Sequence, residues 1–141
     1  MNLNEALFSL MHLVRNNLMQ RLKEIDQNLS PMHMKSLKII SMIDECTGQK
    51  LANYLGRDKA QINRLIKELV VQQLLIKKDN PKDKRSQLLE LTGSAKDLIE
   101  EFVKAEVELS RVMAAGVDPE QLAEFIQVSQ KLKANLEKLN T

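Results

Sequence analysis

The chain has 141 residues, of which 43% are hydrophobic and 28% are charged, and its formal net charge is +2. This length fits one domain, and the hydrophobic content argues against a disordered chain. Aromatic residues make up only 3%, with four Gly and three Pro, which favours a helical core of Leu, Ile, Val and Met. No apolar run approaches the roughly 18 residues that span a bilayer, and the N-terminal residues lack a signal-peptide pattern. A single cysteine excludes an internal disulfide, so we expect a cytoplasmic protein.

Two helices are predicted in the first third of the chain. Within residues 4–28, apolar side chains recur in steps of three and four, which indicates one helical stripe. Ser30 and Pro31 then begin a second helix, since serine is a good N-cap and proline fits the first helical position. This second helix is expected to end before Gly48.

A pair of short helices comes next. Residues 49–55 form the first, which Gly56 closes in a left-handed cap. The second begins at Asp58, whose carboxylate can accept a hydrogen bond from the amide of Gln61. One face of this second helix is polar and basic. The opposite face is apolar and comprises Ile62, Leu65, Ile66, Leu69 and Val70.

A basic hairpin follows these helices. Residues 74–76 are predicted as a short strand, residues 79–86 as a charged loop and residues 87–91 as a second strand. Five Lys or Arg lie between Lys77 and Arg85. Two strands alone are marginally stable, so the hairpin must lean on the helices.

Two more helices complete the prediction. The first covers residues 95–115 and ends at Gly116, and the second begins at Asp118 and Pro119, a good cap and a good first residue. Both carry long apolar stripes. The apolar residues of the last helix are Leu122, Phe125, Ile126, Leu132, Leu136 and Leu139.

The charge is unevenly distributed along the chain. Residues 49–92 carry ten Lys/Arg and five Asp/Glu, a net charge of +5, whereas residues 1–48 are neutral and residues 93–141 carry −3. A localised basic region is typical of a surface that binds a polyanion, although a solvated face gives the same pattern. A helix of about 10–12 Å diameter fits the major groove of DNA, and a basic hairpin beside it can reach phosphates or the minor groove.

The segment GQKLANYLGRDKAQINRLIKELVVQQLLIKKDNPKDKRSQLLELT resembles the winged helix-turn-helix of the MarR family of bacterial transcription regulators. The hairpin DNPKDKRSQLLELT is close to the family's Asp-x-x-Asp-x-Arg pattern, which precedes a strand ending in Leu-Thr. The resemblance implies a mainly α fold with a small antiparallel β-wing. It also implies dimerisation helices in residues 1–29 and 95–141 around a DNA-binding region in residues 30–94, all within one compact domain.

The resemblance further implies a set of DNA-binding residues. The recognition helix would start at Asp58, with a major-groove face, and Lys67 would contact phosphate. Arg85 would enter the minor groove, steadied by Asp83. The major-groove residues would be Lys59, Gln61, Asn63 and Arg64, and the other phosphate contacts would be Thr47, Gln49, Lys82 and Lys84.

Two departures from the family pattern affect the turns. Gln73 stands where the family usually has glycine after the recognition helix, and a non-glycine residue in a left-handed cap costs about 1 kcal/mol. Gly93 follows Thr92 directly, whereas the family favours glycine three residues after its Leu-Thr. Neither departure removes a group that faces DNA.

The resemblance implies a homodimeric, ligand-responsive regulator, more often a repressor than an activator, that binds a pseudo-palindromic operator. Its two recognition helices would lie about 34 Å apart. Two alternatives stay open: a winged-helix module for protein–protein interaction, and a redox-responsive regulator acting through Cys46. A structural role is the simpler interpretation of Cys46.

Other chemistry has little support in the sequence. His12 and His33 lack a Cys/His cluster that would complete a metal site, and no Gly-rich phosphate loop or Ser/His/Asp order indicates an enzyme or a cofactor. The first two helices are rich in methionine, which fills cores more often than it lines ligand pockets. These methionines include Met11, Met19, Met32, Met34 and Met42.

Overall fold

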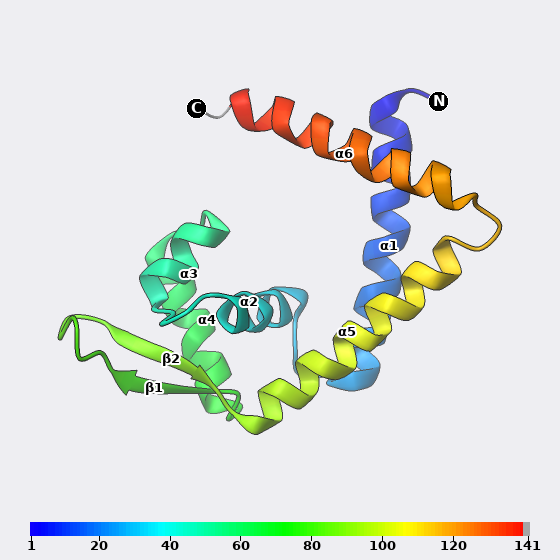
Figure 1. The fold of residues 1–141 in the computed structure, drawn as a ribbon. Coiled ribbons are helices and arrows are strands. Elements are labelled where there is room, and N and C mark those ends of the chain that lie inside the picture. Colours follow the sequence, from blue (N-terminus) through cyan, green and yellow to red (C-terminus); the bar gives the residue numbers. More distant parts are fainter. Residues whose placement is uncertain (140–141) are drawn as a thin grey trace. The chain divides into compact units, whose positions relative to one another are not determined.

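The computed structural model describes residues 1–139, which form six helices and one two-stranded sheet (Figure 1). The chain divides into two compact units, Met1–Glu106 and the part from Val107 onward. The predicted class, mainly α with a small antiparallel wing, is confirmed. The elements are α1 (Leu3–Ile25), α2 (Pro31–Met42), α3 (Gly48–Leu55), α4 (Lys59–Val71), β1 (Leu75–Asp79), β2 (Gln87–Leu91), α5 (Gly93–Met113) and α6 (Pro119–Leu139).

Capping side chains fix the first two helices. Asn2 forms a capping box with Glu5 at the start of α1, which the sequence patterns did not predict. The helix ends at Ile25, earlier than the predicted residue 28, because Asp26 adopts an extended backbone. Ser30 caps α2 and Pro31 is its first residue, as expected.

The α3–α4 pair follows the predicted capping closely. Gly56 closes α3 with a φ of 63°, and the carboxylate of Asp58 accepts from the amide of Gln61 at 3.0 Å. Helix α3 starts at Gly48, one residue before the predicted range of 49–55. A β-carbon at Gly48 would lie 3.3 Å from Cδ1 of Ile66, so glycine lets the start of α3 approach α4 closely.

The hairpin of β1 and β2, called the wing below, is longer than the sequence patterns indicated. β1 runs to Asp79, so the loop comprises residues 80–86 rather than 79–86. The strands pair antiparallel, from Leu75 opposite Leu91 to Asp79 opposite Gln87. In Figure 1 the tip of the hairpin extends past α3 and α4.

A third segment, the turn between α2 and α3, pairs with strand β2 of the wing. Thr47 forms an isolated antiparallel bridge with Leu88, and the amide of Leu89 donates to the carbonyl of Cys46 at 2.8 Å. The turn between α2 and α3 is therefore hydrogen-bonded to β2. The periodicity of the sequence carries no signal for this long-range pairing.

The base of the wing is fastened to the end of α4. Gln73 does adopt the left-handed conformation, with a φ of 62°, and the amide of Leu74 donates back to the carbonyl of Leu69 at 2.9 Å. The hydroxyl of Thr92 donates to the carbonyl of Gln73 at 2.8 Å and accepts from the amide of Ala95 at 3.2 Å. As Thr92 caps α5, that helix starts at Gly93 and not at residue 95.

The core lies between α2, α3, α4 and the wing. Leu37, Leu51 and Leu69 are fully buried there, and Phe102 brings the first part of α5 against the same cluster. Lys38 of α2 reinforces this attachment, since its ammonium pairs with Glu106 at 2.6 Å and lies 5.7 Å from the centre of the Phe102 ring. Within residues 1–139 every helix is too short or too polar to cross a membrane.

Candidate nucleic-acid interface

Helix α4 turns a basic stripe toward solvent. At about 100° per residue, Arg64 and Lys67 lie opposite the buried Ile62, Ile66 and Leu69. Both cations are exposed. Within residues 1–139 neither forms an ion pair, so both are available to an anionic partner.

The other predicted α4 residues occupy its N-terminal end and its flanks. Lys59 and Gln61 are exposed, and the carboxylate of Asp58 is already engaged as the cap. Asn63 lies on the flank nearest α3, where its Oδ1 would be 3.8 Å from a β-carbon at Gly48. Gln61 and Asn63 therefore point to different sides of α4, and only one flank borders α3.

The two predicted residues at the start of α3 differ in exposure. Thr47 is buried, with 7% of its surface exposed, and its hydroxyl oxygen accepts from the amide of Lys50 at 3.2 Å. Gln49 is exposed and its amide donates to Asn53 at 2.9 Å. A phosphate contact by either residue stays a prediction, and Thr47 would first have to be uncovered.

The cations of the wing fall into two groups. Lys84 and Arg85 are exposed, and within residues 1–139 neither forms an ion pair. Lys82 pairs with Glu45 at 3.1 Å, and Lys78 pairs with Glu90 across the hairpin.

Among the hydrogen bonds that order the wing tip, two run from backbone amides to side chains. Asp83 accepts from the amide of Arg85 at 2.9 Å, and Asn80 accepts from the amide of Lys82 at 3.0 Å. Asp83 therefore steadies the backbone of Arg85, which leaves the guanidinium free to extend.

Three residues that the sequence patterns did not single out belong to the same surface. Arg57 lies directly before the cap of α4 and is exposed. Ala60 lies on the outward stripe with Arg64, where its methyl group suits contact with thymine. Lys50 folds its ammonium onto the carbonyls of Asp44 and Glu45, which orders the turn before α3.

Cys46 sits at the junction of this surface with the core. It is 2% exposed, and its thiol donates to the carbonyl of Thr47 at 3.5 Å. Burial raises the pKa of the Cys46 thiol, while the nearby Lys50 charge opposes this shift. A buried thiol of raised pKa reacts slowly with oxidants, which favours the structural role.

The two histidines serve structural hydrogen bonds. His12 contacts Asn16 on α1, whereas His33 lies between Ser30 and Glu68 of α4. In the part of the chain that the structure describes, no three His, Cys, Asp or Glu side chains are grouped as a metal site requires.

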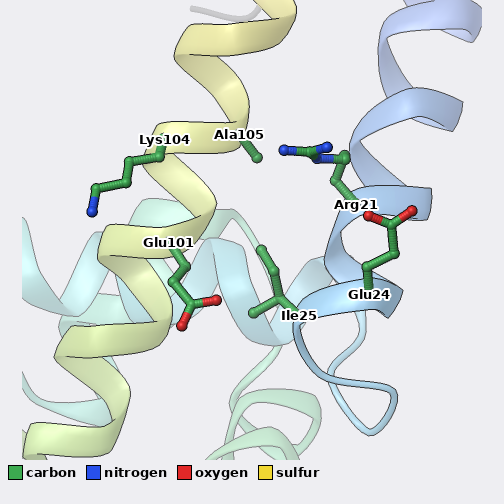
Figure 2. Close-up of a pocket in the computed structure, with 6 residues that line it drawn as sticks. All are labelled: Arg21, Glu24, Ile25, Glu101, Lys104 and Ala105. Carbon is green, nitrogen blue, oxygen red and sulfur yellow. The ribbon is translucent and has the colours of Figure 1, made fainter.

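A shallow hollow of about 290 Å³ lies between the C-terminal end of α1 and α5 (Figure 2). Arg21 and Ile25 point toward α5 in this view. None of the methionines considered above lines it: Met34 is buried in the core, while Met11 and Met42 are exposed. Its lining residues are Arg21, Glu24, Ile25, Glu101, Lys104 and Ala105.

The comparison with known protein families concerns the same winged region. Residues 29–87 match the sequence profile of the MarR family. These residues form a MarR-family region of the chain. The matched region runs from the residue before the α2 cap to the start of β2, and so contains α4 and the wing loop.

Individual relatives are distant in sequence but close in fold. The chain is 24% identical over 108 residues to the uncharacterized HTH-type transcriptional regulator YdgJ of Bacillus subtilis, across 77% of this chain and 66% of that protein. A crystal structure of a Staphylococcus aureus MepR–DNA complex superposes with a TM-score of 0.80 at 18% identity, covering 96% of this chain and 98% of that one. The crystal structure of MarR gives a TM-score of 0.79 at 18% identity, covering 99% and 94%.

Proposed function

We propose that this chain is a transcription regulator that binds double-stranded DNA as a homodimer, at a pseudo-palindromic operator. The observation that carries this proposal is a pair of exposed cationic sites, Arg64 and Lys67 on α4 and Lys84 and Arg85 on the wing, which form no ion pair within residues 1–139. Both sites belong to one packed unit in which α4 contacts β1.

Each element has a distinct task in this proposal. The outward stripe of α4 enters the major groove, where Arg64 suits guanine and an amide such as Gln61 or Asn63 suits adenine. Lys67 and Lys84 contact phosphate, which adds affinity without base preference. Arg85 reaches into the neighbouring minor groove, whose negative potential attracts arginine.

The dimer is supported by apolar surface on the terminal helices. No residue of α6 from Pro119 to Leu139 is buried, although Phe125, Ile126 and Leu136 are large and apolar. On α1, Phe8 and Met11 are also exposed. A second copy of the chain would cover such stripes, and a two-fold dimer would present two α4 helices to successive major grooves.

Regulation would act on the spacing of the two α4 helices. A small-molecule effector that binds better to a dimer with wrongly spaced helices would shift the population away from the operator. Repression then follows from occupancy of DNA near a promoter. We propose a cytoplasmic location because the target is DNA.

Selection of bound fragments from random DNA tests this function most directly. We expect a recovered site with two-fold symmetry and half-sites about one helical turn apart. Affinity for this site should fall steeply with salt, by several units in the log–log slope.

Arg85→Ala should weaken binding to the selected site while the thermal unfolding of the protein stays unchanged. Lys23→Ala on α1 removes an exposed cation outside the interface and serves as the matched control. Normal affinity in Arg85→Ala would remove the wing from the interface.

Asn63→Ala should relax base preference at one position, by about 1–3 kcal/mol.

A further inference from the structure

The wing cation Lys82 is held by an acidic residue that is distant in sequence. The ammonium of Lys82 lies 3.1 Å from the carboxylate of Glu45, 37 residues away. The two side chains are 74% and 54% exposed. Of the four cations from Lys78 to Arg85, Lys82 therefore pairs with a residue outside the hairpin, whereas Lys84 and Arg85 form no ion pair in the described part of the chain.

The backbone delivers Glu45 to this position. Glu45 has a left-handed φ of 50°, and the ammonium of Lys50 donates to its carbonyl at 3.2 Å. The next residue, Cys46, is hydrogen-bonded through its carbonyl to Leu89 of β2. The acidic turn is thus attached to the wing by main-chain hydrogen bonds, which keep its carboxylate beside the wing tip.

We propose that Glu45 acts as an electrostatic brake on DNA binding, which means that it lowers the affinity for DNA. Its carboxylate pairs with the ammonium of Lys82 and repels an approaching phosphate. This inference rests on the proposed function. Lys82 must leave Glu45 to reach a phosphate, or else the phosphate must approach a fixed carboxylate; both lower affinity.

The opposite role, in which Glu45 prepares Lys82 for DNA, fits the geometry less well. The wing tip is already ordered by Asn80 and Asp83, which accept from backbone amides at 3.0 and 2.9 Å. The Lys82 side chain remains 74% exposed in the pair, so Glu45 engages its charge without fixing its path.

The size of the brake follows from the exposure of the pair. Exposed ion pairs are worth little, so the release of one Lys82 corresponds to a gain in DNA affinity of about 1.5- to five-fold. A dimer has two wings, and the gain for a whole operator is then roughly two- to 25-fold. Since phosphate contacts carry no base information, base preference should not change.

Glu45→Gln tests the inference, with Asp44→Asn as the matched control. Asp44 is an exposed neighbour in the same turn, and it forms no ion pair with Lys82. Operator affinity of the full-length protein is measured by fluorescence anisotropy over a range of salt concentrations, with thermal unfolding as the check of folding. We expect a larger gain for Glu45→Gln than for Asp44→Asn, shrinking as salt rises.

The same pair of substitutions in a Lys82→Gln background completes the test. There the gain from Glu45→Gln should fall to that of Asp44→Asn, because the cation that Glu45 holds is absent. Equal gains in both backgrounds, no gain, or a loss of affinity on Glu45→Gln would each overturn the brake. If the unchanged protein binds no DNA, the proposed function fails and this inference fails with it; if it binds and only the Glu45 result is negative, the inference alone fails.

Discussion

The winged region and the last helix bury their apolar side chains to very different extents. Around α4, Leu37, Leu51 and Leu69 are fully buried within the protomer, whereas α6 buries none of its residues from Pro119 to Leu139. Both regions have comparable amphipathic patterns in the sequence. The difference teaches that the first stripe meets partners in its own chain, while the second stays exposed within residues 1–139.

Removing a core side chain should separate the two regions most strongly. Leu69→Ala should lower the free energy of unfolding by about 2–5 kcal/mol, because it deletes a fully buried side chain where α4 meets the wing. Val71→Ala, on the exposed side of the same helix, should change it by less than about 0.5 kcal/mol. Denaturant unfolding at a fixed protomer concentration gives both values, and a similar loss for the two variants would contradict this assignment of the core.

A charge on the α6 stripe should act on assembly instead of on folding. Phe125→Asp should dissociate the proposed dimer and lower operator affinity about 100-fold, or about 2.7 kcal/mol, since a symmetric interface would lose two aromatic contacts. Gln127→Asp places the same charge about 200° away on the helix and should leave the dimer intact. Sedimentation equilibrium reports the state of each variant; a dimeric Phe125→Asp protein would show that α6 faces no second copy.

The bond between His33 and Glu68 should contribute a smaller effect inside the winged region. The Nδ1 of His33 accepts from the amide of Ser30, so its Nε2 carries the proton donated to Glu68 at 2.6 Å. Glu68→Ala removes that acceptor and should cost about 1–2 kcal/mol of unfolding free energy. Glu68→Gln keeps an acceptor and should recover most of it. Equal losses for both variants would show that the carboxylate charge matters more than the hydrogen bond.

The left-handed turn after α4 should give the smallest effect, and of opposite sign. Gln73→Gly should stabilise the protein by about 0.5–1 kcal/mol, because glycine adopts a φ of 62° without strain. Gln72→Gly is the control, since Gln72 has an ordinary φ of −77° and glycine there should destabilise by a similar amount. Thermal unfolding of both variants decides whether the turn stores this strain.

Sequence patterns predicted the elements well where the determinants are local. Ser30, Gly56 and Asp58 cap the helices that they were expected to cap. The second strand has its predicted bounds, Gln87–Leu91. Some errors lie at boundaries set by long-range contacts, as at Gly93, where Thr92 bonds to Gln73 and starts α5 two residues early. Others are local, as at the start of α1, whose capping box of Asn2 and Glu5 was not predicted.

For the candidate site, sequence patterns likewise predicted some features and missed others. Composition and helical periodicity predict an outward cationic stripe containing Arg64 and Lys67, because the opposite residues must enter the core. They give no sign that Thr47 is buried or that Asn63 lies beside the start of α3. Those placements depend on the way α3 packs against α4.

The sequence by itself determined which segments are helical, that Ser30, Gly56 and Asp58 cap three of them, and that the middle of the chain is basic, since these properties depend on neighbours within a few residues. Only the tertiary structure decided which charges are free. Glu45 meets Lys82 and His33 meets Glu68 across 37 and 35 residues. Such pairs form because packed backbone brings distant side chains together, and neither helical periodicity nor composition records that proximity.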